Sequence, residues 1–151
     1  MDYMKLAVDA TIHGMDNKIG GPFGATVVRN GEVVVAISNT MMRDTDPSAH
    51  AELVAIREAC KKLNTFDLSD CEIYATCEPC PMCVGVIMWT GIKKVYYCNT
   101  RQDAHVHGFS DQHLRDYLSG KDTSFLKMIK VEKREDCDHL FEYFHELQNK
   151  K

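Results

Sequence analysis

The sequence lacks any apolar run close to the roughly 20 residues that a membrane-spanning helix requires, so it predicts no membrane partner. Residues 1–5 lack the basic and then apolar pattern of a secretory signal, and we therefore expect a cytoplasmic protein. No repeat, linker or low-complexity tract divides the sequence, so residues 1–151 are predicted to form a single domain.

Positive charge is not in excess either. The 18 Lys and Arg residues are outnumbered by 22 Asp and Glu residues, which gives a formal net charge of −4. Extensive binding to a phosphate backbone usually needs a basic face, so nucleic acid is disfavoured as a partner. The seven cysteines are an odd number and no export signal accompanies them. We therefore interpret the clustered cysteines as metal ligands and not as a disulfide framework.

Hydrophobic periodicity and turn residues predict helices and strands in alternation. Asn30-Gly31 lies between two β-rich runs and predicts a two-residue hairpin, whereas Asp46-Pro47 predicts a helix start. Strands that alternate with helices indicate an α/β sheet covered on both faces, and the hairpin makes this sheet mixed. The predicted helices span residues 2–17, 46–63, 81–89, 111–118 and 138–148, the predicted strands span residues 25–28, 32–37, 71–76, 94–98 and 129–132, and polar loops are expected at residues 38–45 and after residue 98.

Two short motifs carry candidate chemistry: His50-Ala51-Glu52 and Pro79-Cys80-Pro81-Met82-Cys83. One imidazole and two thiolates supply three zinc ligands, and a zinc ion held by three protein groups keeps a coordination position for water, as catalytic zinc sites do. Cysteines at i and i+3 share a helix face, and a helix N-terminus lowers the pKa of their thiols. We predict one Zn²⁺ per chain, with Glu52 free of the metal and available to carry protons.

Each motif alone has a simpler interpretation. A lone His-x-Glu on a helix is usually a solvated face, and a lone Cys-x-x-Cys is often a redox pair or half of a structural site. Together, H-x-E and P-C-x-x-C form the signature of zinc-dependent deaminases, which favours a catalytic zinc. Cys77 is a candidate fourth ligand, and its spacing to Cys80 and Cys83 also occurs in iron–sulfur proteins, but the run lacks their further cysteine. We interpret Cys77 as a buried thiol at a strand end.

In these motif residues, the chain resembles the cytidine deaminase-like superfamily, and within it the small bacterial guanine deaminases. The resemblance covers nearly the whole chain, and the later loop is what distinguishes guanine deaminases from their relatives. The matching segments are Ile19-Gly-Gly-Pro-Phe-Gly-Ala25, Asp46-Pro-Ser-Ala-His-Ala-Glu52, Ala55-Ile-Arg-Glu-Ala-Cys60, Thr76-Cys-Glu-Pro-Cys-Pro-Met-Cys-Val-Gly85, Trp89, Asp103-Ala104 and Gly108-Phe-Ser-Asp111.

The resemblance implies a role for each matching position. The zinc ligands would be His50, Cys80 and Cys83, the catalytic carboxylate would be Glu52, and Asp111 would relay a proton to the departing amino group. From the residues alone, Asp111 could equally be a helix N-cap. The implied fold is a three-layer α/β/α sandwich with a five-stranded mixed sheet.

The resemblance also implies a substrate pocket. Asn39 would hydrogen-bond a purine, Ala51 would offer its backbone beside the ring, and Phe23 and Trp89 would line the pocket. The simpler interpretations are a turn for Asn39 and core packing for the two aromatic residues. Guanine deaminases of this size are homodimers that exchange C-terminal segments, here about residues 125–151. The chain ends in Asn149-Lys-Lys151, whereas the family continues into an aromatic residue that helps to close the site, and this departure bears on the substrate.

The expected activity is zinc-dependent hydrolytic deamination of a nucleobase, with guanine converted to xanthine and ammonia. Cytosine or a related aminated ring is an alternative, and so is the adenosine of a tRNA. A tRNA enzyme would need a basic terminal helix, whereas residues 136–146 mix acidic residues with histidines. A zinc-binding module without activity is the alternative outside the enzymes, but neither Glu52 nor a ligand is missing.

Overall fold

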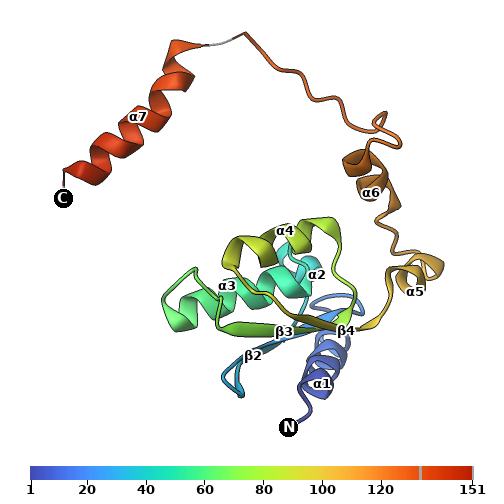
Figure 1. Ribbon diagram of the computed structural model, residues 1–151. Coiled ribbons are helices and arrows are strands. Elements are labelled where there is room, and N and C mark those ends of the chain that lie inside the picture. Colours follow the sequence, from blue (N-terminus) through green and yellow to red (C-terminus); the bar gives the residue numbers. More distant parts are fainter. Residues whose placement is uncertain (133, 151) are drawn as a thin grey trace.

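The computed structural model describes residues 1–132 and 134–150, and within them a four-stranded sheet has the order β2-β1-β3-β4 (Figure 1). The strands are β1 (Gly24–Arg29), β2 (Glu32–Ser38), β3 (Cys71–Cys77) and β4 (Val95–Asn99). β1 pairs antiparallel with both β2 and β3, whereas β3 pairs in parallel with β4. The predicted mixed sheet is therefore confirmed.

The hairpin between β1 and β2 forms where the sequence predicts it. Asn30 and Gly31 have φ values of 50° and 79°, so both turn residues are left-handed, as a tight two-residue hairpin requires. The turn sets Arg29 opposite Glu32, and the register shifts once between Val27 and Val28. The hairpin therefore places β2 at one edge of the sheet, beside β1.

Helices cover both faces of this sheet. α1 (Tyr3–Asp16) lies on one face, and α3 (Ala51–Leu63) and α4 (Pro81–Thr90) lie on the other (Figure 1). This arrangement confirms the predicted α/β/α layers. β3 follows the end of α3 and precedes the start of α4 in the sequence, so the end of this central strand leads into the first turn of α4.

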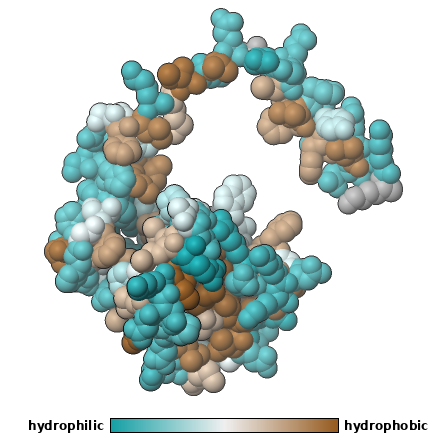
Figure 2. Space-filling view, turned by 180° about the vertical axis from the view of Figure 1, so that it is seen from behind, coloured by the Kyte–Doolittle hydropathy of each residue, from teal (hydrophilic) through white to brown (hydrophobic). Residues whose placement is uncertain are grey.

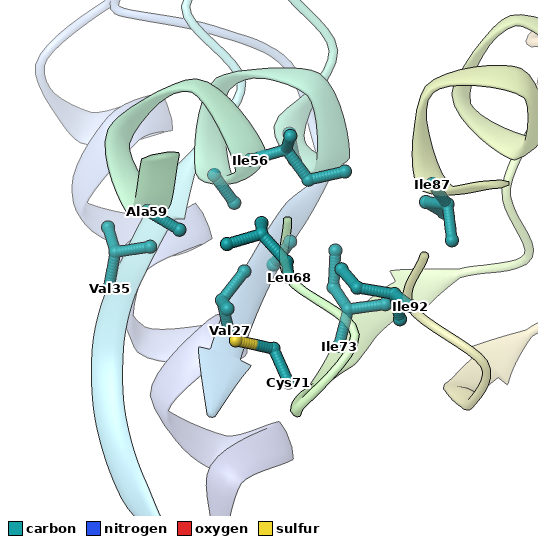
Figure 3. Packing of buried hydrophobic residues seen from close by; sticks show 12 residues of the cluster. Val27, Val35, Ile56, Ala59, Leu68, Cys71, Ile73, Ile87 and Ile92 are labelled. Atoms are coloured by element: carbon teal, nitrogen blue, oxygen red, sulfur yellow. The ribbon is translucent and has the colours of Figure 1, made fainter. Parts of the chain in front are cut away.

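The main core fills the space between the sheet and α3 (Figure 3). Val27, Leu68 and Ile73 are completely buried there, and burial of such a side chain stabilises the fold by about 1.5–3 kcal/mol. Alanines allow the helix to approach the strands closely: Ala55 and Ala59 of α3 are also fully buried. This packing holds the first turn of α3 at the edge of the core.

The helix predicted at residues 46–63 begins later than expected. α3 starts at Ala51 with His50 as its N-cap, and not at Asp46. The carboxylate of Asp46 instead accepts hydrogen bonds from the backbone N–H and the hydroxyl of Ser48, which stabilises a turn before the helix. The polar loop expected at residues 38–45 contains the short helix α2 (Met41–Asp44).

The region after β4 contains a helix that the sequence analysis did not predict. α5 (Arg101–Val106) begins with a capping box, in which Thr100 and Asp103 bond to each other's backbone N–H groups. The predicted helices that follow are confirmed as α6 (Gln112–Ser119) and α7 (Glu135–Asn149), with small differences at their ends.

The prediction of a fifth strand at residues 129–132 is wrong for this chain, because these residues form no strand. They belong to an exposed arm, residues 121–132, that leads away from the sheet to α7 (Figure 1). A strand needs a neighbour for its backbone hydrogen bonds, and the arm lies beside none within the described part of this chain. Among residues 1–132 and 134–150, the sheet therefore has four strands.

Gly24 tests the packing of α1 against the sheet. A Cβ atom at Gly24 would overlap the Thr11 hydroxyl and the Ala7 carbonyl oxygen of α1. We expect Gly24→Ala to lower the free energy of unfolding by about 1–3 kcal/mol in urea denaturation, because the helix must move away from β1. Gly85→Ala is the matched control, since a Cβ atom there meets nothing within 4 Å and the change should be neutral or slightly stabilising. Equal stability of both variants would contradict this account.

Candidate metal centre

Two helix N-termini bring the predicted ligands together. His50 is the N-cap of α3, Cys80 is the N-cap of α4, and Cys83 lies in the first turn of α4. Pro81 at the first position of α4 fixes the backbone angle with which that helix begins. Both helices direct the positive ends of their dipoles towards the ligands, which favours thiolate over thiol.

The spacing of the ligand atoms fits one tetrahedral ion. The Nδ1 atom of His50 lies 3.5 Å from the Sγ atom of Cys80 and 3.7 Å from that of Cys83. Zinc bonds of about 2.0–2.1 Å to nitrogen and 2.3 Å to sulfur, at a tetrahedral angle, place such atoms about 3.6 Å apart. All three ligand atoms lie within 4.8 Å of one another. The donor set and its geometry therefore suit Zn²⁺ with one coordination position left for a small molecule.

The electrostatics of the two thiols also favour a cation. A hydrogen bond from Cys83 is the main reason why the pKa of Cys80 is lowered, to about 4. The same hydrogen bond, followed by burial, raises the pKa of Cys83. A second thiolate beside the first is thus disfavoured by charge repulsion, and a divalent cation between the two relieves it. The pKa of His50 is raised, chiefly by its hydrogen bond with Cys80.

Glu52 lies one residue beyond the fully buried Ala51 and is itself only 7% exposed. Burial is the main cause of its raised pKa, because removal from water disfavours the carboxylate. Glu52 lines the same cavity as His50 and Cys80. A buried carboxyl group with a raised pKa next to a metal centre is suited to hold and release a proton.

The cavity has a volume of about 560 Å³ and opens beside the ligands. Its lining combines apolar side chains with hydrogen-bonding groups. The apolar lining residues are Phe23, Met41, Met42, Ala104 and Phe109, and the polar ones include Asn39, Glu78, Arg101, Ser110 and Asp111. The rings of Phe23 and Phe109 meet edge to face at a centroid distance of 5.2 Å. This volume and lining suit a small planar molecule.

Asn39 shapes the cavity wall through the backbone. Its amide nitrogen donates to the carbonyl oxygens of Gly21 and Phe23, at 2.9 and 3.0 Å, and its Oδ1 atom accepts from the Gly21 N–H. The side chain is 1% exposed. Both amide hydrogens are therefore engaged, and the remaining lone pair on Oδ1 is the part of Asn39 that is left to accept a further hydrogen bond.

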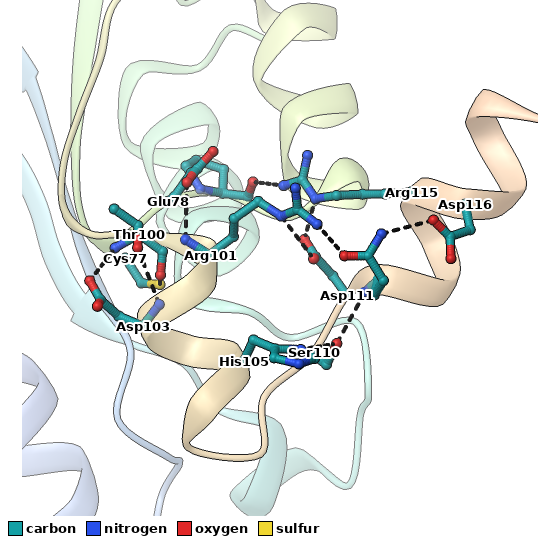
Figure 4. A network of polar contacts seen from close by, with 12 residues as sticks. Cys77, Glu78, Thr100, Arg101, Asp103, His105, Ser110, Asp111, Arg115 and Asp116 are labelled. Carbon is teal, nitrogen blue, oxygen red and sulfur yellow. Dashed lines mark hydrogen bonds and ion pairs between the residues drawn. The ribbon is translucent and has the colours of Figure 1, made fainter. Parts of the chain in front are cut away.

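Asp111 lines the cavity from the start of α6. It occupies the N-cap position, but within the described residues its side chain caps no backbone N–H group of that helix. Its Oδ2 atom instead accepts from Arg115 Nε at 3.0 Å, and its Oδ1 atom lies 3.8 Å from Arg101 Nε (Figure 4). The alternative role as a side-chain N-cap does not describe this geometry.

The structure does not bring every predicted pocket residue to the cavity. Trp89 of α4 is 89% exposed and lies outside the cavity lining of the described chain. Ala51 is buried between His50 and Glu52, and its side chain does not line the cavity either. Their contacts with a substrate stay predictions.

Cys77 is the buried strand-end thiol that the sequence analysis proposed. It ends β3, its Sγ atom donates to the carbonyl oxygen of Thr100 at 3.6 Å, and it stands apart from the cluster of three ligands. Burial raises the pKa of this thiol to about 11, so it stays protonated at neutral pH. Sequence reasoning missed Arg101, Met41 and Met42 as lining residues, because no local motif marks them. It also missed Glu78, which lies within the matching segment 76–85 but was assigned no role there.

The chain is similar in sequence to known zinc-dependent deaminases. The family model for the cytidine and deoxycytidylate deaminase zinc-binding region matches residues 1–99. Guanine deaminase of Bacillus subtilis (strain 168) is 45% identical, over 72% of this chain and 70% of that protein. A tRNA-specific adenosine deaminase of Aquifex aeolicus (strain VF5) is also 45% identical, but over half of each chain.

A solved structure resembles the whole molecule. The crystal structure of guanine deaminase from Bacillus subtilis has a TM-score of 0.87 and 35% identity, covering 95% of this chain and 92% of that one. No helix among the residues described here is long and apolar enough to cross a membrane.

Removal of one ligand tests the metal centre. We expect the purified chain to contain one zinc ion per chain by elemental analysis, and Cys83→Ser to lose most of it, because the serine hydroxyl is a poor substitute for a buried thiolate. Cys98→Ser is the matched control, since Cys98 is exposed on β4 and should leave the zinc content unchanged. Full zinc occupancy in Cys83→Ser would contradict the ligand assignment.

Proposed function

This chain belongs to the cytidine and deoxycytidylate deaminase zinc-binding family, and from that membership we propose that it hydrolyses guanine to xanthine and ammonia. One water is consumed, the bond from ring carbon to amino nitrogen breaks, and the nitrogen leaves as ammonia. The observation that carries this proposal is the cluster of His50, Cys80 and Cys83 beside one cavity of suitable size, which His50, Cys80 and Glu52 line. Zinc, when bound by these ligands, supplies Lewis-acid activation of water at neutral pH.

Proton transfer is the task of Glu52. Its carboxylate accepts a proton from the attacking water and, as the acid, delivers it to the ring nitrogen beside the reacting carbon. The raised pKa of this buried group supports the second half of that cycle, because the protonated form is favoured away from water. Asp111, on the same cavity, then helps to protonate the leaving amino group.

The remaining cavity residues bind and orient the ring. Phe23 packs against one face of the flat base. Phe109, which meets the Phe23 ring edge to face, narrows the cavity beside it. Asn39 accepts a hydrogen bond from the base through the free lone pair of Oδ1, and Ala51 contributes its backbone. Trp89, which does not line the cavity of its own chain, contributes to the pocket in the assembled enzyme.

A base is favoured over a tRNA adenosine for two reasons. The guanine deaminase is 45% identical over 72% of this chain, whereas the Aquifex aeolicus tRNA enzyme reaches the same identity over only half of it. The net charge of −4 and the three acidic residues in the first turn of α7 oppose a polyanion. The reduced thiols of a zinc site of this kind persist in the cytoplasm, where we place the reaction.

The exposed arm and α7 support a homodimer in which residues 125–151 are exchanged between two otherwise single-domain chains. Large apolar side chains are exposed along them, and apolar residues are visible on the arm in Figure 2. They are Phe125, Leu126, Met128, Ile129, Val131, Leu140, Phe141, Phe144 and Leu147. Such a run of apolar surface is unfavourable in water unless another surface covers it.

The sheet edge offers a place for the exchanged segment. β4 has β3 on one side and no strand on the other within the described residues, so its outer backbone groups can accept a further strand. The exposed arm of the partner would then run along this edge of β4. Tyr97 of β4 is exposed at this edge strand and would be covered by the partner.

Glu52→Gln tests the proton carrier. We expect this variant to retain zinc, because the ligands are unchanged, and to lose at least about 10²-fold in turnover of guanine, because glutamine cannot transfer a proton. Ammonia release and elemental analysis measure the two quantities. Glu58→Gln on the outer part of the same helix is the matched control and should keep full activity. An active Glu52→Gln enzyme would exclude Glu52 as the carrier.

The same ammonia assay separates the candidate functions. Zinc-loaded protein is given guanine, cytosine, adenine and unmodified tRNA in turn, and guanine should be the preferred substrate. Turnover of tRNA alone would favour the nucleic-acid enzyme. Silence on all four substrates with zinc bound would favour a zinc-binding module without activity.

Light scattering tests the dimer. We expect the full chain to have twice its 17.2 kDa mass, and Phe144→Asp to shift it towards one chain, because the charge opposes burial of α7. Glu146→Ala, which removes a polar side chain from the same helix, should leave the dimer intact. A monomeric wild-type chain at micromolar concentration would refute the exchange.

A further inference from the structure

We propose that Arg115 is a positioning residue, which holds the Asp111 carboxylate at a fixed place relative to the metal ligands. The inference rests on the proposed deamination, in which Asp111 handles a proton at the same cavity. Arg115 itself is absent from the cavity lining within the described chain, so any effect on the reaction passes through Asp111.

Arg115 joins two elements that are distant in the sequence. Its Nε atom donates to Oδ2 of Asp111, the N-cap of α6, at 3.0 Å. Its Nη2 atom donates to the carbonyl oxygen of Pro79 at 3.3 Å, 36 residues away in the sequence. Pro79 immediately precedes the ligand Cys80. A single guanidinium group therefore links the carboxylate to the turn that presents a metal ligand (Figure 4).

The planar guanidinium group makes this link rigid. Its N–H groups point in fixed directions, so bonds to a carboxylate and a carbonyl oxygen together define both distance and orientation. The Arg115 side chain is 28% exposed and the Asp111 side chain is 20% exposed, so water weakens this ion pair less than it weakens the surface pairs of this chain.

Arg101 supports Asp111 in a different way. Its Nε atom lies 3.8 Å from Asp111 Oδ1, which is too far for a hydrogen bond, and its Nη2 atom donates to Gln112. Its backbone N–H donates to Glu78 Oε1 at 3.0 Å. Arg101 thus adds positive charge and anchors α5 to the loop before α4, whereas Arg115 sets the position of the carboxylate.

Without Arg115, another conformation of Asp111 becomes favourable. Asp111 is the N-cap of α6, and an aspartate at this position commonly turns its side chain to accept from the second or third backbone N–H group of the helix. That rotation would direct the carboxylate towards its own helix. Misplacement of a reacting group by about 1 Å can cost about 10²-fold in rate.

A double-mutant cycle tests the inference with guanine as substrate. We expect Arg115→Ala to lower kcat by about 10- to 100-fold, with KM changed less than about twofold and zinc content unchanged. In an Asp111→Ala background, the same substitution should lower kcat by less than about twofold, because its partner is already gone. Arg115→Lys should fall between Arg115→Ala and the wild type, since one ammonium group can reach only one of the two acceptors.

Arg29→Ala is the matched control. Arg29 also pairs with an aspartate, Asp70, at 3.7 Å, and its side chain is 42% exposed on β1, away from the cavity. It should keep the wild-type kcat. Losses that add fully in the Arg115→Ala, Asp111→Ala double variant, or a wild-type kcat in Arg115→Ala, would overturn the inference.

A crystal structure of Arg115→Ala provides a test that does not depend on turnover. We expect the Asp111 carboxylate to leave its present position, and an unchanged carboxylate would overturn the inference even if the rate fell. Arg115→Lys serves the same comparison if the alanine variant is unstable. Failure of the wild-type chain to deaminate any base would instead refute the proposed function, and the crystal structure would still decide the placement of Asp111.

Discussion

The approach of His50 to Cys80 and Cys83 is the constraint on which the rest of the site depends. These ligands come from the first turns of two helices that pack on the same face of the sheet, and β3 lies between them in the sequence. The buried alanines of α3 and the buried side chains packed beneath them fix the start of that helix. The cavity next to the three ligands then needs few further side chains for catalysis, chiefly Glu52 and Asp111.

The repeating features of the fold were predictable from the sequence, because they depend on local patterns. The Asn30-Gly31 turn and the helix that begins at Pro81 follow from short-range rules. The start of α3 was not predictable in this way, since the Asx turn at Asp46 competes with helix formation. The prediction of a strand at residues 129–132 was also wrong, because strand formation depends on a neighbouring strand that the local sequence does not specify.

For the site, the sequence identified the groups whose chemistry is local to a motif. His50, Cys80 and Cys83 come together as their spacing indicates, and Glu52 lies beside them in the cavity. The link through Arg115 could not be predicted, because it depends on a carbonyl oxygen 36 residues away that carries no sequence signal. The exposed position of Trp89 shows the opposite case, where a matching residue lies outside the cavity of its own chain.

The position of the ligands on either side of β3 has a consequence for the whole chain. A cation that joins His50 to Cys80 closes a loop of about thirty residues, which includes α3 and β3, and so acts as a reversible cross-link. Closure of a loop of this length by a covalent bridge removes roughly 3–4 kcal/mol of conformational freedom from the unfolded chain. Resistance to heat and to proteases should therefore track the cell's supply of zinc, so that metal starvation depletes the protein by degradation as well as by silencing it.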